Sequence, residues 1–441
     1  MNKLRRFEQF QDYIARLYPE NFSNESVRKM LSRTVTFQVT DKCSLACKYC
    51  YQINKGTRRM SFDTAKKLID LLLSGEKGLK EYVSPETSHA IIIEFIGGEP
   101  LLEVELIEQI CDYFFDRVIE MQHPWATNYM ISICSNGVAY FDPKVQRFLN
   151  KYKNRLSFSV TIDGNKELHD SCRVFPDGVT GSYDLAVAAA QDWMNKGYYM
   201  GSKITIAPDN LIHLYDAIVH MINLGYNEIN ANVVYEKGWE QHHAVEYYKQ
   251  LKRIADYFLD NNLVEDIFLA LFENNNFKPM EEHDNENWCG GNGFMLSCDP
   301  DGYLYPCIRY MESSLGKKIE PYRIGNVDDG LSATPEDIQR IKCLQCITRR
   351  SQSTDECFYC PIAKGCSWCS AYNYQETGTP DKRATYICEM HKARSLANVY
   401  FWNKYYIKNN IDDRFVMHCP KEWAINIITE DEYDMLLKLS K

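Results

Sequence analysis

Residues 36–50 have the sequence TFQVTDKCSLACKYC. The run Thr36–Val39 contains β-branched and aromatic residues and favours a β-strand. Cys43, Cys47 and Cys50 follow it with the spacing C-x-x-x-C-x-x-C. Three thiolates can hold a cubane 4Fe-4S cluster by three corners, which leaves the fourth iron without a protein ligand. The stretch therefore predicts a strand followed by an iron-sulfur site at which a small molecule can bind.

Two other interpretations of this triplet are a zinc site and a coincidental group of core cysteines. A structural zinc ion normally takes four ligands, often in C-x-x-C pairs. None of the ten histidines of the chain lies near this loop. The pattern therefore favours an iron-sulfur cluster.

Outward from the triplet, β-rich runs alternate with amphipathic helical stretches between about Thr34 and Asn262, which is typical of parallel βαβ units. One helix is predicted over Asp63–Leu73, where apolar residues recur on one face. The predicted strands are Thr36–Val39, Ala90–Ile96, Tyr129–Ile133, Ser157–Ile162, Ser202–Ile206 and Glu228–Val234. Six such units predict an α/β fold with an open, partial (β/α)6 barrel of the TIM type.

Five segments are expected along the chain. They are an N-terminal helical segment (1–33), the barrel (34–262), a linker (263–288), a cysteine-rich, loop-rich module (289–391) and a C-terminal tail (392–441). The module has little apolar periodicity, so we expect metal sites to stabilise it. The tail is expected to form a helix, a short strand and a second helix.

Composition narrows the function classes. The chain has 441 residues, 45% of them hydrophobic, and a formal net charge of -10. An acidic chain without a basic surface is not expected to bind nucleic acid or anionic membranes. No run of about 18 apolar residues and no secretion signal is present, so we expect a cytoplasmic protein. In a reducing compartment, 17 cysteines indicate metal ligation more than disulfides.

The triplet, with Tyr49 directly before its last cysteine, resembles that of the radical S-adenosylmethionine superfamily. The resemblance implies that the amino and carboxylate groups of S-adenosylmethionine chelate the open iron. It further implies that one electron breaks the sulfonium bond and yields a 5′-deoxyadenosyl radical, which abstracts a hydrogen from the substrate. A barrel mouth would shield such a radical.

The resemblance also implies a set of contacts to S-adenosylmethionine at the ends of the strands. Glu99 is expected to receive the methionine ammonium, with a plain turn as the alternative. Arg173 is expected to pair with the methionine carboxylate, with a loop arginine or a structural ion pair as the alternative. The expected contacts are Tyr49, Gly97, Gly98, Glu99, Ser135, Asn136, Thr161 and Arg173.

The C-terminal cysteines resemble those of the SPASM module, which holds two auxiliary 4Fe-4S clusters. One or two zinc ribbons are the alternative. The resemblance implies that the outer cluster is ligated by Cys357, Cys360, Cys366 and Cys388. It implies that the inner cluster, which faces the barrel, is ligated by Cys289, Cys307 and Cys369. Together with the triplet, this makes three 4Fe-4S clusters.

Several cysteines depart from that pattern. Only two residues separate Cys366 from Cys369, where the family usually has three, and Cys298 is an uncertain fourth ligand of the inner cluster. If Cys298 is not a ligand of the inner cluster, one iron of that cluster is open and can bind a substrate thiolate. Cys343 and Cys346 either replace a ligand or form a free, reactive or structural pair. The remaining four are expected to be small core residues: Cys111, Cys134, Cys172 and Cys419.

Among the reactions of this family, anaerobic sulfatase maturation uses an aspartate base directly after the cysteine that matches Cys307. Here that residue is Ile308, which cannot take a proton. We therefore expect the maturation of a ribosomally made peptide, with a thioether formed at a cysteine. Carbon-carbon crosslinking, sulfatase maturation, and an iron-sulfur scaffold or electron carrier are the alternatives. A carrier, however, has no use for an open three-cysteine site.

Two partners are expected: a cysteine-containing precursor peptide and a flavodoxin or ferredoxin-type electron donor. Many peptide maturases carry a leader-binding domain of about 80 residues, larger than the segment before the first predicted strand. The leader is therefore expected to bind residues 1–33, the tail after Lys392, or a separate protein.

Overall fold

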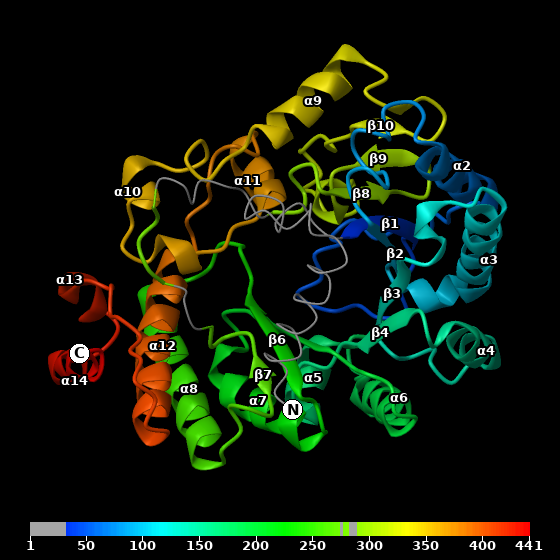
Figure 1. Cartoon of the computed structure of the whole chain (residues 1–441). Helices are drawn as coiled ribbons and strands as arrows, with labels where there is room; N and C mark the ends of the chain where they lie inside the picture. Colours follow the sequence, from blue (N-terminus) through cyan, green and yellow to red (C-terminus); the bar gives the residue numbers. More distant parts are fainter. Residues whose placement is uncertain (1–31, 274–276, 282–288) are drawn as a thin grey trace.

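The computed structural model describes residues 32–273, 277–281 and 289–441 (Figure 1). Of the predicted N-terminal helical segment, residues 1–31 lie outside the described part, whereas Ser32 and Arg33 begin the first strand. In the described part, no helix has the length and apolarity that a membrane crossing requires.

Parallel strands at the centre of the larger sheet come from the runs that the sequence predicts. β2 pairs with β1 and β3, and β3 pairs with β4, all in parallel. The four strands are β1 (Ser32–Thr40), β2 (Ala90–Gly97), β3 (Tyr129–Ser135) and β4 (Leu156–Val160). The connections between them are helical, so the predicted α/β fold with a parallel sheet is confirmed.

The larger sheet continues into the cysteine-rich region. β8 pairs with β1 in parallel, and β9, β10 and β11 follow as antiparallel neighbours. Their bounds are β8 (Met295–Cys298), β9 (Tyr303–Tyr305), β10 (Gly325–Asn326) and β11 (Gly330–Leu331). The module is thus joined to the β1 edge of the parallel strands by backbone hydrogen bonds.

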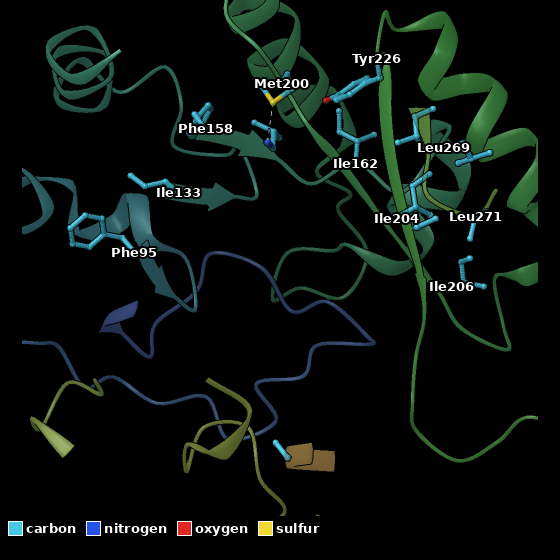
Figure 2. Packing of buried hydrophobic residues seen from close by; sticks show 14 of the residues in the cluster. Phe95, Ile133, Phe158, Ile162, Met200, Ile204, Ile206, Tyr226, Leu269 and Leu271 are labelled. Atoms are coloured by element: carbon cyan, nitrogen blue, oxygen red, sulfur yellow. Dashed lines mark hydrogen bonds between the residues drawn. The ribbon is translucent and has the colours of Figure 1, made fainter. Parts of the chain in front are cut away.

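A second sheet has the order β5-β6-β7 and is also parallel. Its strands are β5 (Ser202–Ile206), β6 (Glu228–Val233) and β7 (Phe268–Leu269). β7 falls in the predicted linker, which a two-residue strand does not reveal in the sequence. Met200 connects the two sheets, because its sulfur accepts a hydrogen bond from Val160 N at 3.3 Å (Figure 2).

Helices cover one face of these strands, and their apolar residues form the core. Ile91, Ile93 and Phe95 alternate along β2 with less buried residues and pack in the core with residues of α2 and α3. Figure 2 shows this packing continuing through Phe158 and Ile204. The helices are α2 (Phe62–Ser74), α3 (Val104–Glu120), α4 (Pro143–Tyr152), α5 (Lys166–Cys172), α6 (Tyr183–Asn195), α7 (Leu214–Asn223) and α8 (Gln241–Asp260).

The last part of the chain packs against the second sheet through α12, which lies beside α8 (Figure 1). The tail is helical throughout its regular parts, so the short strand predicted within residues 392–441 is wrong. Asn403 explains the turn after α12, because its side chain bonds both Phe415 N and Phe415 O. The helices are α9 (Pro335–Gln345), α10 (Asp355–Phe358), α11 (Ser370–Thr377), α12 (Cys388–Lys408), α13 (Lys421–Ala424) and α14 (Glu430–Leu439).

Candidate functional site

The cysteine loop, residues 43–50, follows β1 at the carboxyl ends of the parallel strands. Two backbone hydrogen bonds tie it to the segment after α5: Ala46 N to Val174 O at 2.8 Å and Lys48 N to Cys172 O at 3.0 Å. The loop is therefore held between the end of β1 and the chain that follows β4.

Hydrogen-bond donors point at the sulfurs of this loop. Cys43 Sγ accepts from Leu45 N at 3.4 Å and faces Asn136 Nδ2 at 3.9 Å, while Cys47 Sγ faces Arg173 Nη1 at 3.9 Å. Burial raises the pKa of the Cys43 and Cys47 thiols, and the neighbouring thiols raise it further. N–H donors and a bound metal both stabilise thiolates, so the loop fits an iron-sulfur cluster. In the described ranges, no group of three or more His, Cys, Asp or Glu is arranged to hold a single metal ion.

Gly97 and Gly98 bring the end of β2 against the start of this loop. Gly98 N donates to Thr40 O and Glu99 N donates to Lys42 O, both at 2.9 Å. A Cβ on Gly98 would lie 2.4 Å from Lys42 O, which is closer than any side chain tolerates. The glycines thus permit close approach to the loop backbone itself.

Glu99 is 1% exposed and joins the ends of β2 and β3. Its carboxylate accepts from Ser135 Oγ at 2.8 Å, from Asn136 N at 2.8 Å and from Leu101 N at 3.1 Å. Burial raises the pKa of Glu99, and these donors oppose the increase. A carboxylate accepts about four hydrogen bonds, so room for one further donor remains.

Asn136 and Thr161 extend this group. Asn136 Nδ2 donates to Ser44 Oγ at 2.9 Å, which connects the end of β3 to the cysteine loop. Thr161 follows β4 directly, and its Oγ1 lies 3.4 Å from Sγ of Cys134 in β3. The structure therefore brings the residues predicted after the first four strands to one edge.

Tyr49 and Arg173 meet at Asp163. Arg173 Nε donates to Asp163 Oδ2 at 2.9 Å and to Tyr49 Oη at 2.7 Å, and Tyr49 also bonds Asp163. Arg173 is thus in a buried ion pair through its Nε atom, and its Nη1 atom lies 3.9 Å from Cys47 Sγ. Asp163 Oδ1 is buried and has no hydrogen-bond partner among the described residues, so it can accept one from a bound molecule.

Two further residues near the site, Asp163 and Glu94, have no role assigned to them from the sequence. Asp163 lies three residues after β4, but its hydrogen bond with Tyr49 joins residues 114 positions apart. Glu94 interrupts an apolar strand, and a charge in such a run is the signal that could have identified it. Glu94 lies on the face of β2 that is turned away from the helices, and its carboxylate accepts a hydrogen bond from Thr36 Oγ1 at 2.6 Å. Burial raises the pKa of Glu94. Glu94 is therefore a largely buried carboxyl group on the inner face of β2.

The outer cysteines gather around two arginines. Arg383 Nη2 lies 2.8 Å from Cys366 Sγ, and the guanidinium groups of Arg349 and Arg383 both lie over the Trp368 ring. The thiols of Cys357, Cys360 and Cys388 are the other electrostatic neighbours of Arg383. Burial, followed by the neighbouring thiols, raises the pKa of Cys388 to about 12. Thiolates there need a compensating metal or cation, which fits the predicted cluster.

The inner cysteines lie close to Gly291. A Cβ on Gly291 would lie 3.3 Å from Cys307 Sγ and 3.7 Å from Cys289 Sγ. Glycine at this position therefore keeps a side chain from crowding the two sulfur atoms. Ser370 Oγ lies 3.4 Å from Cys289 Sγ. Burial is the main cause that raises the pKa of Cys307, and the nearby Cys369 thiol raises it further.

Cys298 lies in β8, opposite Phe37, and is fully buried. The Cys298 thiol donates a hydrogen bond to Asp299 O at 3.4 Å. Burial raises the pKa of Cys298, and the charge of Asp299 raises it further. Cys343 is next to Tyr322 at the end of α9, with Cys346 following.

Four further cysteines were expected in the core. Cys111 and Cys419 are buried as predicted, and Cys172 is partly buried. Cys134 is exposed, so its prediction as a core residue is wrong. The reason is strand alternation: Cys134 belongs to the inner-facing row of β3, between the buried Ile133 and Ser135.

A cleft of about 390 Å³ opens beside the cysteine loop. It is lined by Lys48 and Tyr49 of the loop, by Leu168 and Cys172 of α5, and by Asn210 after β5. A small molecule can therefore reach the loop from this side.

No family model matches the chain. Over 202 residues the chain is 28% identical to the uncharacterized protein MJ0907 of Methanocaldococcus jannaschii, a match that covers 45% of this chain and 62% of that protein. Over 134 residues it is 30% identical to a serine-type anaerobic sulfatase-maturating enzyme of Bacteroides thetaiotaomicron, covering 30% of this chain and 29% of the enzyme.

Longer but weaker matches connect the chain to two further proteins. It is 22% identical over 290 residues to the antilisterial bacteriocin subtilosin biosynthesis protein AlbA of Bacillus subtilis, covering 64% of this chain and 56% of AlbA. It is 20% identical over 286 residues to the radical SAM cyclopropyl synthase TigE of Paramaledivibacter caminithermalis, covering 62% and 57%. The chain spans less than two thirds of the length of each of these relatives.

Solved structures share the fold. The structure of anSMEcpe with bound AdoMet and Kp18Cys peptide aligns with a TM-score of 0.59 at 17% identity, over 86% of this chain and 100% of that chain. Streptococcus suis SuiB bound to precursor peptide SuiA aligns with a TM-score of 0.52 at 13% identity, over 87% and 80%. The homologues of this chain that have an assigned activity are radical S-adenosylmethionine enzymes.

Proposed function

We propose that the chain is a radical S-adenosylmethionine maturase of a ribosomally made peptide and that it forms a thioether at a peptide cysteine. The observation that carries the proposal is the loop 43–50, whose three cysteines stand at the carboxyl ends of parallel strands beside the Tyr49–Asp163–Arg173 group. The precursor peptide in the SuiB structure and the bacteriocin role of AlbA support a peptide substrate.

The proposed architecture is an open, partial (β/α)6 barrel followed by a SPASM module with two auxiliary clusters. The two parallel sheets, β1 to β4 and β5 to β7, support the barrel. The cysteine groups around Gly291 and around Arg383 support one auxiliary cluster each. A flavodoxin or ferredoxin-type donor would supply the electron.

At the cysteine loop, Cys43, Cys47 and Cys50 would hold the cluster. When bound there, S-adenosylmethionine and the reduced cluster supply a 5′-deoxyadenosyl radical that removes a hydrogen from the peptide. Arg173 would receive the methionine carboxylate through its Nη atoms while Asp163 holds Nε. Asp163 Oδ1 would accept a hydrogen bond from the bound molecule.

A thioether is favoured because the inner cysteines number three. Cys298 is fully buried in β8 and bonds its own neighbour, so we propose that it is not a ligand. The vacant position would take the thiolate of the peptide. Sulfatase maturation is supported by the Bacteroides relative but lacks an aspartate at Ile308, and carbon-carbon crosslinking is also compatible with the fold.

The test is anaerobic reconstitution followed by three measurements: bound iron, 5′-deoxyadenosine release, and the mass of cysteine-rich peptides encoded beside the gene. We expect about twelve irons, cleavage of S-adenosylmethionine, and a peptide that has lost two hydrogens and one alkylatable thiol. Replacement of Cys43 by Ala should abolish cleavage, whereas replacement of the buried Cys111 should preserve it. Cleavage that survives Cys43→Ala would refute the proposal.

A further inference from the structure

Two guanidinium groups stand against the outer cysteines. Arg383 Nη2 contacts Cys366 Sγ at 2.8 Å and also donates to Cys366 O at 3.2 Å. Arg349 is 3% exposed, and its Nη2 lies 3.5 Å from the same carbonyl. Both guanidinium groups also lie over the Trp368 ring, that of Arg349 at 5.0 Å and that of Arg383 at 5.2 Å from the ring centroid.

Neither cation is neutralised by a carboxylate within the described residues. Arg349 Nε is buried and has no hydrogen-bond partner there. Two like charges in a buried position are unfavourable unless an anion compensates them. The groups of opposite charge around both arginines are the outer thiolates, Cys366 first and then Cys357 and Cys360.

The inner cysteines have a different electrostatic surrounding. Arg309 is the cation beside Cys307 and Cys369, and its Nη2 forms an ion pair with Glu236 Oε1 at 2.8 Å. A carboxylate therefore already offsets this charge. The two cysteine groups are thus unequal, with two uncompensated cations at the outer group and one compensated cation at the inner group.

We propose that Arg349 and Arg383 make the outer cluster the final acceptor of the electron that the peptide releases. The inference rests on the proposed function. As the carbon-sulfur bond forms, the peptide has given one hydrogen atom to the radical and its thiol proton to a base, and one electron is left over. That electron reduces an oxidised auxiliary cluster, which gains one negative charge, and a nearby cation stabilises the added charge.

The direction of transfer follows from the same asymmetry. The inner group faces the barrel in the proposed arrangement and would receive the electron first. The more positive surroundings of the outer group then favour its passage outward. Arg349 and Arg383 act here as positioning residues, since they set where the electron rests without contacting the peptide.

The test is a redox titration followed by electron paramagnetic resonance, on reconstituted protein whose first cluster is removed by Cys43→Ala, Cys47→Ala and Cys50→Ala. In Arg349→Gln we expect the reduced-to-oxidised ratio of one auxiliary cluster at a fixed potential to fall by about tenfold or more. Arg383→Gln should act in the same direction, whereas Arg383→Lys retains the charge and should retain the ratio. Arg350→Gln is the matched control, because Arg350 is a neighbouring surface arginine that pairs with Asp355.

The possible failures are distinguishable. If Arg349→Gln binds iron fully and the ratio is unchanged, or if Arg350→Gln shifts it equally, the inference is overturned while the proposed function stands. If the wild-type outer cysteines hold zinc, the inference fails together with the proposed outer cluster, whereas the radical chemistry proposed at residues 43–50 is tested separately by 5′-deoxyadenosine release. Iron content and thermal stability, measured for each variant, identify any that does not assemble.

Discussion

Gly98→Ala tests whether close backbone contact positions the cysteine loop. The new Cβ would lie 2.4 Å from Lys42 O and 2.7 Å from Asp41 O, and both are backbone atoms that cannot turn aside. The loop would have to move by about 1 Å, which strains the hydrogen bonds of Gly98 and Glu99 to it. Overpacking and weakened hydrogen bonds together should cost about 2–4 kcal/mol of the free energy of unfolding.

For a chain of this length, that cost corresponds to a melting temperature lower by about 2–4 °C. Scanning calorimetry of the iron-free protein under reducing conditions measures it, and iron binding after reconstitution reports the loop geometry. Gly316→Ala is the matched control, because its nearest neighbour would be Ile319 at 3.8 Å and its stability should change by less than about 0.5 kcal/mol. If Gly98→Ala melts like the wild type and binds as much iron, the reasoning is refuted.

Three further predictions concern other parts of the site. Cys298→Ala should leave iron content unchanged, whereas Cys307→Ala should lose about four irons, and equal losses would make Cys298 a ligand. Asp163→Asn should destabilise the fold by about 3–5 kcal/mol, since the buried guanidinium of Arg173 loses its counter-ion. The substitution should also reduce the increase in melting temperature that S-adenosylmethionine causes. A melting curve with the ligand that equals that of the wild type would contradict this prediction. Burial, followed by the charge of Arg173, lowers the pKa of His169 to about 4. Between about pH 6.5 and pH 4, the His169 ring is therefore protonated in the unfolded chain but neutral in the folded chain. The free energy of unfolding consequently falls as the pH falls through this range. Denaturant unfolding at pH 7.5 and 5.5 should therefore show about 1 kcal/mol less pH dependence in His169→Gln, and an unchanged difference would exclude this residue.

The sequence predicts the elements with strong local signals. β5 spans Ser202–Ile206 as expected, and β2 differs from its prediction by one residue, because long β-rich runs favour strands whatever surrounds them. β7 and β8 escape prediction, since strands of two and four residues have no periodicity and form because a neighbouring edge offers hydrogen-bond partners. The strand predicted in the tail fails for the converse reason, because no sheet edge pairs with it in the described structure.

The cysteine triplet could be recognised from its spacing, because thiols a few residues apart lie close together in almost any fold. The ligand sets of the two auxiliary clusters came from the resemblance of the C-terminal cysteines to the SPASM module, and they stay predictions. The electrostatic surroundings were not readable in this way. Arg173 reaches Tyr49 across 124 positions, and Arg383 meets Cys366 across 17, through contacts that no local pattern encodes. Charge compensation depends on distance in space, so only the tertiary structure decided which cations carry a carboxylate partner and which are left to the cysteines.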